Sequence, residues 1–164
     1  MNKKFQRGLA LRASKGFTLI EILVVIGILA VLLAITLIAI NPAKQFAQAN
    51  NTKRSSDVNA VLNAVNQYAV DHKGDISAIG IPDSNSGPIV IGSDTAAGEL
   101  DFCPEIVPTY IAEMPVDPIS GVWVSCTDYT SGYTIVQSVS DSRITVAAPD
   151  TEMPPANEAI TVTR

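Results

Sequence analysis

The sequence has little of what catalytic and metal sites are built from. It contains two cysteines and a single histidine, His72. No glycine-rich phosphate loop follows a candidate strand, and no helical stretch has metalloprotease spacing. A lone histidine near a helix end is typical of a favourable charge at the helix dipole, and no serine or cysteine has a partner placed to activate it. We therefore expect neither enzymatic activity nor a cofactor.

Acidic residues are absent before Glu21, so residues 1–16 carry only positive charge, from Lys3, Lys4, Arg7, Arg12 and Lys15. We interpret residues 1–16 as a cationic leader that stays on the cytoplasmic side of a membrane. Without this leader, six Lys and Arg remain against sixteen Asp and Glu, so the side chains sum to −10. Nucleic-acid binding needs a basic surface, so we expect no nucleic-acid partner.

Charge is nearly absent from the next stretch, residues 17–40, whose only charged side chain is Glu21. A helix of that length measures about 36 Å, enough to cross a hydrocarbon core of about 30 Å. In lipid the run is helical, because only then does every backbone polar group find a partner within the segment. An ionised carboxylate near a membrane costs several kcal/mol unless it is paired, so Glu21 indicates a functional position.

Removal of the leader would supply a partner for Glu21. The small residue Gly16 precedes the apolar run, whereas an ordinary secretory signal has its small-residue cleavage site after the run. Cleavage between Gly16 and Phe17 creates an α-amino group on Phe17, a cation with an unperturbed pKa of about 8. That group lies one helical turn from Glu21 of the same chain, and it can also reach Glu21 of a neighbouring chain.

The string GFTLIEILVVIGILAVLLAI, residues 16–35, resembles the type IV pilin family, including the pseudopilins of type II secretion. The resemblance covers Lys15 to about Asp71 well and the rest loosely. It implies that a prepilin peptidase cuts after Gly16 and methylates the amino group of Phe17. It also implies that Glu21 neutralises the terminus of an adjacent subunit during assembly.

A structural subunit of a type IV pilus, major or minor, is therefore the function we expect, serving adhesion, motility or DNA uptake. The implied partners are other copies in a helical filament, the prepilin peptidase and the pilus assembly machinery of the inner membrane. The precursor would be a single-pass protein of the cytoplasmic membrane with its N-terminus inside, and the assembled form a cell-surface pilus. The alternatives are a type II secretion pseudopilin and an anchored extracellular domain that never polymerises.

The fold class we expect is α+β, with a leader over 1–16, a long helix over 17–73 and a globular head over 74–164. The helix should kink near Pro42 and end with Gly74 as its C′ residue. Its second half should pack against an antiparallel sheet of three to five strands through an apolar stripe, Val58, Val61, Leu62, Val65 and Tyr68. In the polar stretch before that stripe, Lys53 and Arg54 either meet acidic groups of a neighbour or form a solvated face.

Strands are expected at residues 89–91, 122–126, 133–139 and 143–148, with an optional edge strand at 159–163. Turn-forming residues occur at 128–132 and 140–142. Helical turns are expected within 95–100 and between Pro108 and Pro115.

Cys103 and Cys126 most simply form one disulfide, because an even cysteine count in an exported domain favours a bridge. A 23-residue separation without further cysteine or histidine nearby matches no zinc pattern. The acidic residues Asp94, Glu99 and Asp101 lack the spacing of an EF-hand, and we predict no specific metal. Trp123, the sole tryptophan, is expected in the core rather than in an exposed binding patch.

Overall fold

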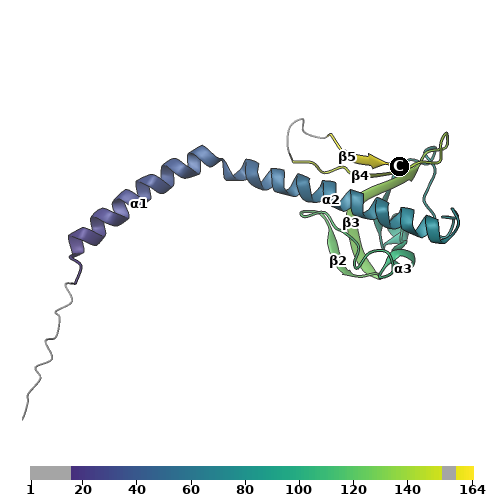
Figure 1. Ribbon diagram of the computed structural model, residues 1–164, viewed down its shortest axis with the longest axis horizontal. Coiled ribbons are helices and arrows are strands. Elements are labelled where there is room, and N and C mark those ends of the chain that lie inside the picture. The colour runs from purple at the N-terminus through teal and green to yellow at the C-terminus, as the bar shows by residue number, and fades with distance from the viewer. Residues whose placement is uncertain (1–15, 153–157) are drawn as a thin grey trace, which may run out of the picture. The chain divides into compact units, whose positions relative to one another are not determined.

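The computed structural model describes residues 16–152 and 158–164 (Figure 1). The predicted leader lies outside the described residues except for Gly16. The chain divides into two compact units at the Asn41–Pro42 junction. The first contains helix α1 (Leu19–Ile40), and the second contains helix α2 (Pro42–Asp71) followed by a small five-stranded sheet. The α+β class predicted from the sequence is confirmed.

The chain forms two helices where the sequence predicts one kinked helix. Asn41, between α1 and α2, has a left-handed backbone with φ 47° and ψ 77°. Pro42 explains the interruption, because proline has no N–H to donate and disfavours a right-handed helical conformation at the residue before it. Asparagine adopts the left-handed region more readily than other residues with a side chain. The predicted kink is therefore a complete break at Asn41.

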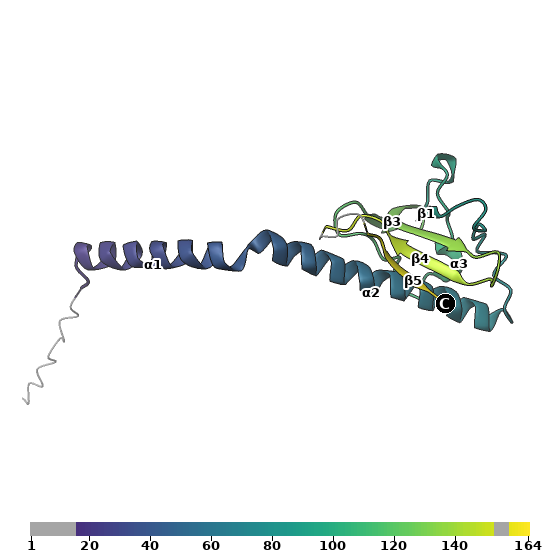
Figure 2. The same cartoon turned by 90° about the horizontal axis from the view of Figure 1, so that it is seen from above.

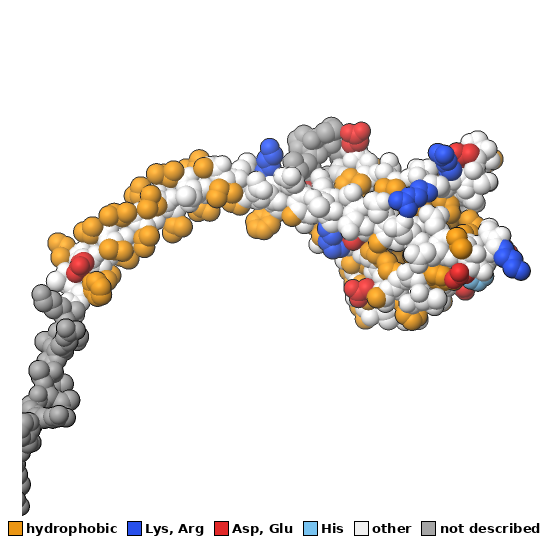
Figure 3. Space-filling model, viewed as in Figure 1, with side chains coloured by type: hydrophobic (Ala, Val, Ile, Leu, Met, Phe, Trp, Pro, Cys, Tyr) orange, Lys and Arg blue, Asp and Glu red, His pale blue; other side chains and the backbone are white. Residues whose placement is uncertain are grey.

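The surface of α1 is apolar along its length. None of its residues is buried within the described chain, and Figure 3 shows hydrophobic side chains spread along the helix, with acidic atoms only at its start. It is the one helix among the described residues that is long and apolar enough to cross a membrane. Exposing such a surface to water is unfavourable, and the helix fits a surrounding of lipid or other apolar helices.

The sheet is antiparallel, with strand order β1-β3-β4-β5, and β2 also pairs with β3. The strands are β1 (Ile89–Gly92), β2 (Val122–Ser125), β3 (Asp128–Gln137), β4 (Ile144–Ala148) and β5 (Ile160–Thr163). The register places Ile135 opposite Val146, and β4 pairs with the C-terminal strand along its length. The number of strands lies within the predicted range, and the optional edge strand is present.

The turn predicted at residues 128–132 is wrong, because β3 runs straight through it. The connection between β2 and β3 is instead the short turn at Cys126 and Thr127. Gly132 has φ +75°, and a Cβ placed on it would come within 2.9 Å of the Asp117 side chain. Glycine is therefore needed here because the Asp117 side chain approaches the strand closely, and not because the chain turns.

Helix α2 packs along one face of the sheet (Figure 2). The predicted stripe from Val58 to Tyr68 is buried, and it shares one core with alternate residues of the strands, including Tyr133, Ile135 and Val146. This alternation is what an antiparallel sheet with one covered face requires. The stripe and the sheet together form the hydrophobic core of the second unit.

The C′ position at the end of helix α2 lies one residue earlier than predicted. Lys73, with φ 58°, takes the C′ position, and Gly74, with φ +91°, follows it. The N–H of Gly74 donates to the carbonyl of Ala69 at 2.7 Å, and that of Lys73 to the carbonyl of Val70 at 3.3 Å. These two bonds form a Schellman motif, which satisfies carbonyls that the helix leaves unpaired.

The short helices lie partly where we predict them. A 3₁₀ turn, η1 (Thr95–Ala97), lies within the predicted range. The turn predicted between Pro108 and Pro115 is wrong, since α3 spans Cys103–Ile106. Proline is well tolerated in the first turn of a helix, and Pro104 occupies that place in α3.

Candidate functional site

The start of α1 is a capping box built from Thr18 and Glu21. The hydroxyl of Thr18 accepts the N–H of Glu21 at 3.3 Å, and the carboxylate of Glu21 accepts the N–H of Thr18 at 3.4 Å. Two of the N–H groups that a helix start leaves unpaired thereby find acceptors. The carboxylate of Glu21 is therefore directed back toward Phe17, on the side of the chain where the predicted cleavage site lies.

The Gly16–Phe17 junction is open to other molecules. Both residues are exposed, Phe17 by 78%. A Cβ added to Gly16 would meet no atom within 4 Å. Hydrolysis of this peptide bond would create an ammonium group one residue before the N-cap Thr18. The Glu21 carboxylate is directed toward that position and stays available to a cation from the same chain or another.

A buried ion cluster in the second unit was missed by the sequence reasoning. Arg54, on α2, is 1% exposed and donates through Nε to Asp117 Oδ2 at 2.6 Å. A second bond joins Nη2 to Asp117 Oδ1 at 3.3 Å, and Nη1 reaches Glu152 Oε2 at 3.1 Å. The expectation that Arg54 meets a neighbour or solvent is wrong, because its partners lie in its own chain.

One sequence signal does point to this burial. Arg54 precedes Val58 by four residues, so it occupies the same face of α2 as the apolar stripe. A cation on the same helix face as the core residues is buried with them, and it then needs a buried acidic partner. That acid, Asp117, lies 63 residues away, where no local pattern connects it to Arg54.

Asp117 is the electrostatic centre of this cluster. Burial by itself would raise the pKa of its carboxyl group, but hydrogen bonds from Arg54 and from the backbone N–H groups of Ser120 and Ile119 outweigh burial and lower the pKa to about 2. The N–H of Asp117 donates in turn to the carbonyl of Ser131 on β3 at 2.7 Å. The cluster thus fastens α2, the loop before β2 and the centre of the sheet to one another.

We predict that acid weakens the second unit through Asp117. Its pKa in the folded chain is below its ordinary value, so the stabilisation is complete above about pH 4 and is lost as pH falls through about 2. The shift corresponds to about 2 kcal/mol of unfolding free energy. Urea unfolding of the chain in detergent between pH 2 and 5 measures this slope. The same slope in Asp117→Asn would contradict the assignment.

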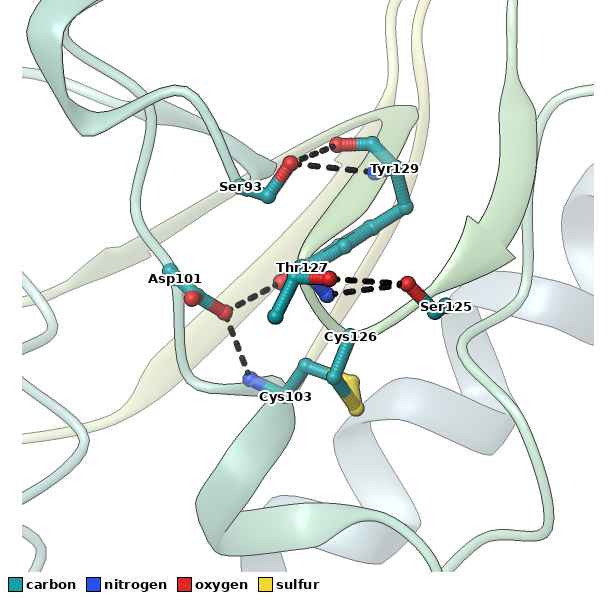
Figure 4. The surroundings of a disulfide bond; sticks show 7 residues. All are labelled: Ser93, Asp101, Cys103, Ser125, Cys126, Thr127 and Tyr129. Atoms are coloured by element: carbon teal, nitrogen blue, oxygen red, sulfur yellow. Dashed lines mark hydrogen bonds between the residues drawn. A yellow bond between two sulfur atoms is a disulfide. The ribbon is translucent and has the colours of Figure 1, made fainter.

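The predicted disulfide is present and joins α3 to the turn between β2 and β3 (Figure 4). The Cα atoms of Cys103 and Cys126 are 5.3 Å apart. Beside it, the carboxylate of Asp101 accepts the N–H of Cys103 at 3.1 Å and the hydroxyl of Tyr129 at 3.0 Å. Burial and this carboxylate both raise the pKa of Tyr129. In the chain-entropy model a bridge over a loop of this length stabilises the fold by about 3 kcal/mol.

The other acidic residues singled out from the sequence have partners within the chain. Asp94 accepts the N–H of Ala97 at 3.0 Å, and Glu99 accepts the N–H of Asp94 at 3.1 Å and the hydroxyl of Thr130 at 3.2 Å. Over residues 16–152 and 158–164, no group of three His, Cys, Asp or Glu side chains is placed to hold a metal ion.

The single histidine and tryptophan also pack within the second unit. The ring of His72 stacks on Tyr68 at 3.9 Å between centroids, and its Nδ1 lies 2.9 Å from the Tyr68 carbonyl oxygen. Trp123 is half-buried and contacts Tyr129 edge to face at 5.5 Å.

The N-terminal region, with Glu21 and the Gly16–Phe17 junction, matches a known family model. Residues 11–37 match the prokaryotic N-terminal methylation motif. Neither a curated protein nor a solved structure matches the chain significantly.

Proposed function

Because this chain carries the N-terminal methylation motif that is the hallmark of type IV pilin and pseudopilin precursors, we propose that it is a structural subunit of a type IV pilus. The peptidase that processes such precursors would cut between Gly16 and Phe17 and methylate the new amino group. The observation that carries the proposal is the match over residues 11–37, which spans both the junction and Glu21.

The exposed apolar surface of α1 supports storage in a membrane followed by polymerisation. Before assembly, lipid would surround the helix, and in the polymer the same helices of other copies would replace the lipid. The transfer brings little net hydrophobic gain, since lipid tails are as apolar as leucine. Packing and polar contacts must therefore select the correct arrangement of copies.

Glu21 is the group we propose for that selection. The methylated ammonium of Phe17 in one copy would pair with the Glu21 carboxylate of the next. A misplaced copy would leave a charge buried without a partner, which costs several kcal/mol. The capping box holds the carboxylate toward the N-terminus and so orients it for this contact.

The second unit would form the exported part of the subunit. Its disulfide suits an oxidising compartment, and its acidic side chains suit solubility outside the cell. We assign it a structural role and no catalysis.

Shearing of intact cells tests the proposal. We expect the chain in a fraction of surface filaments, labelled along their length by an antibody against the second unit. Chain confined to the cell envelope in a short secretion assembly would instead identify a pseudopilin. Chain found only as separate membrane-anchored copies would contradict polymerisation.

A further inference from the structure

The side of α2 that faces away from the sheet carries none of the helix's own charged side chains. Six residues follow one another there at spacings of three and four, which places them on a single face. We call them the amide seam: Gln48, Thr52, Ser56, Asn59, Asn63 and Asn66. All six are exposed or half-exposed, and the seam runs for about 27 Å along the helix.

The charged residues of α2 lie elsewhere. Arg54 is buried, Lys53 donates to the carbonyl of Val116, and Asp57 accepts the hydroxyl of Tyr133 at 2.8 Å. Lys44 and Asp71 occupy the two ends of the helix. The solvent face of a surface helix usually carries charged side chains. Neutrality along the amide seam is therefore unusual in a chain whose mature side chains sum to −10.

Much of the hydrogen-bonding capacity of the amide seam is unused. Within the described chain, the side chains of Gln48, Ser56 and Asn66 make no hydrogen bond. Thr52 and Asn59 donate to carbonyls of their own helix. Asn63 accepts a bond from the guanidinium of Arg164, which flanks the seam. Each side-chain amide offers both donors and an acceptor, so such a face can pair with an identical one.

Toward the end of α2 the surface is hollowed. A groove of about 510 Å³ lies there, with Thr109 and Tyr110 opposite the residues of α2 that line it. Those residues are Asn63 and Asn66 of the seam together with Gln67, Val70 and the acidic Asp71. The groove offers room for side chains of a molecule that faces the helix.

We propose that the amide seam is a contact surface for a second copy of this chain, and that it sets the register between copies. Acidic copies repel one another, so they approach closely only where charge is absent. Because amides also bond well to water, the seam adds little attraction by itself. A polar residue in a helix–helix contact does fix register, since a shifted copy loses its partners. The inference rests on the proposed function, in which α1 brings the copies together.

A lysine placed on the amide seam tests this contact. Ser56→Lys makes the chain less acidic, so general repulsion between copies would fall and polymer would increase. The seam account expects the opposite, a decrease of about tenfold or more in sheared polymer, because the new charge is buried without a partner. Gln48→Lys should behave in the same way. Ser56→Asn, which keeps the seam neutral, and Ala96→Lys, an exposed position in η1, should leave the amount of polymer unchanged.

Each outcome decides between accounts. Unchanged amounts of polymer in both seam variants, or an equal loss of polymer in Ala96→Lys, would overturn the proposal that the amide seam is a contact surface. If Glu21→Gln abolishes polymer while both seam variants assemble normally, the seam fails and the proposed function stands. If the wild-type chain forms no polymer, both the proposed function and the proposed role of the amide seam are wrong. An unchanged melting temperature in the variants shows that the effect is on assembly.

Discussion

Glu21→Gln is expected to abolish filament assembly, while the chain is still cut after Gly16 and accumulates in the membrane in its cleaved form. Glutamine is close in shape and retains a carbonyl that can accept the N–H of Thr18, so the start of α1 is preserved. What is lost is the negative charge that we propose to pair with the Phe17 ammonium of a neighbouring copy. Breaking a buried ion pair costs about 3–5 kcal/mol, and the cost recurs at every subunit added. Glu21→Ala should fail to assemble for the same reason. Sheared filament relative to membrane-bound chain is the measurement.

Thr18→Ala is the matched control, because it removes the other half of the capping box and leaves the charge. Loss of an N-cap side chain costs about 1 kcal/mol of helix stability. We expect filaments in this variant at close to normal abundance. If Thr18→Ala fails as completely as Glu21→Gln, the cap explains the effect and the charge does not. Normal filaments in Glu21→Gln would refute the pairing outright.

Arg54→Ala is expected to destabilise the second unit by about 3–5 kcal/mol. The substitution removes both bonds to Asp117 and leaves that carboxylate buried with only the backbone N–H groups of Ser120 and Ile119 as donors. Urea unfolding of the full chain in detergent gives the free energy. The fluorescence of Trp123 follows the second unit alone, since it is the sole tryptophan and packs on Tyr129 there.

Lys53→Ala provides the comparison for Arg54. Its side chain is 48% exposed and pairs with Asp57 one turn away. A surface pair of this kind contributes about 1 kcal/mol or less, so the loss should be small. Equal losses of unfolding free energy in Arg54→Ala and Lys53→Ala would mean that burial of Arg54 does not govern the stability of the unit.

Periodicity predicted the parts of the fold that depend on neighbours along the chain. The stripe from Val58 to Tyr68 marked the covered face of α2, and β-branched runs marked β2, β4 and β5. The predictions were wrong where residues far apart in the sequence determine the local structure. Gly132 resembles a turn signal, and only the approach of Asp117 shows that it belongs inside β3.

The candidate sites likewise divide into those that neighbouring residues reveal and those that depend on residues far away in the sequence. The junction at Gly16 and the charge at Glu21 are visible from the sequence because they contrast with an apolar surrounding. The Cys103–Cys126 bridge was predicted from the cysteine count and the expected export of this part of the chain. The Arg54–Asp117 pair could not be predicted, since its partners come from different elements and a polar stretch surrounds the arginine. The amide seam becomes evident only once the opposite face of α2 is known to be covered.

Mass spectrometry of the native N-terminus tests the central claim most directly, because pairing of Glu21 requires a new cation at Phe17. The account predicts a mature chain that begins at Phe17 and carries one methyl group on its α-amino nitrogen. A chain that begins at Met1, or at any residue other than Phe17, would contradict it.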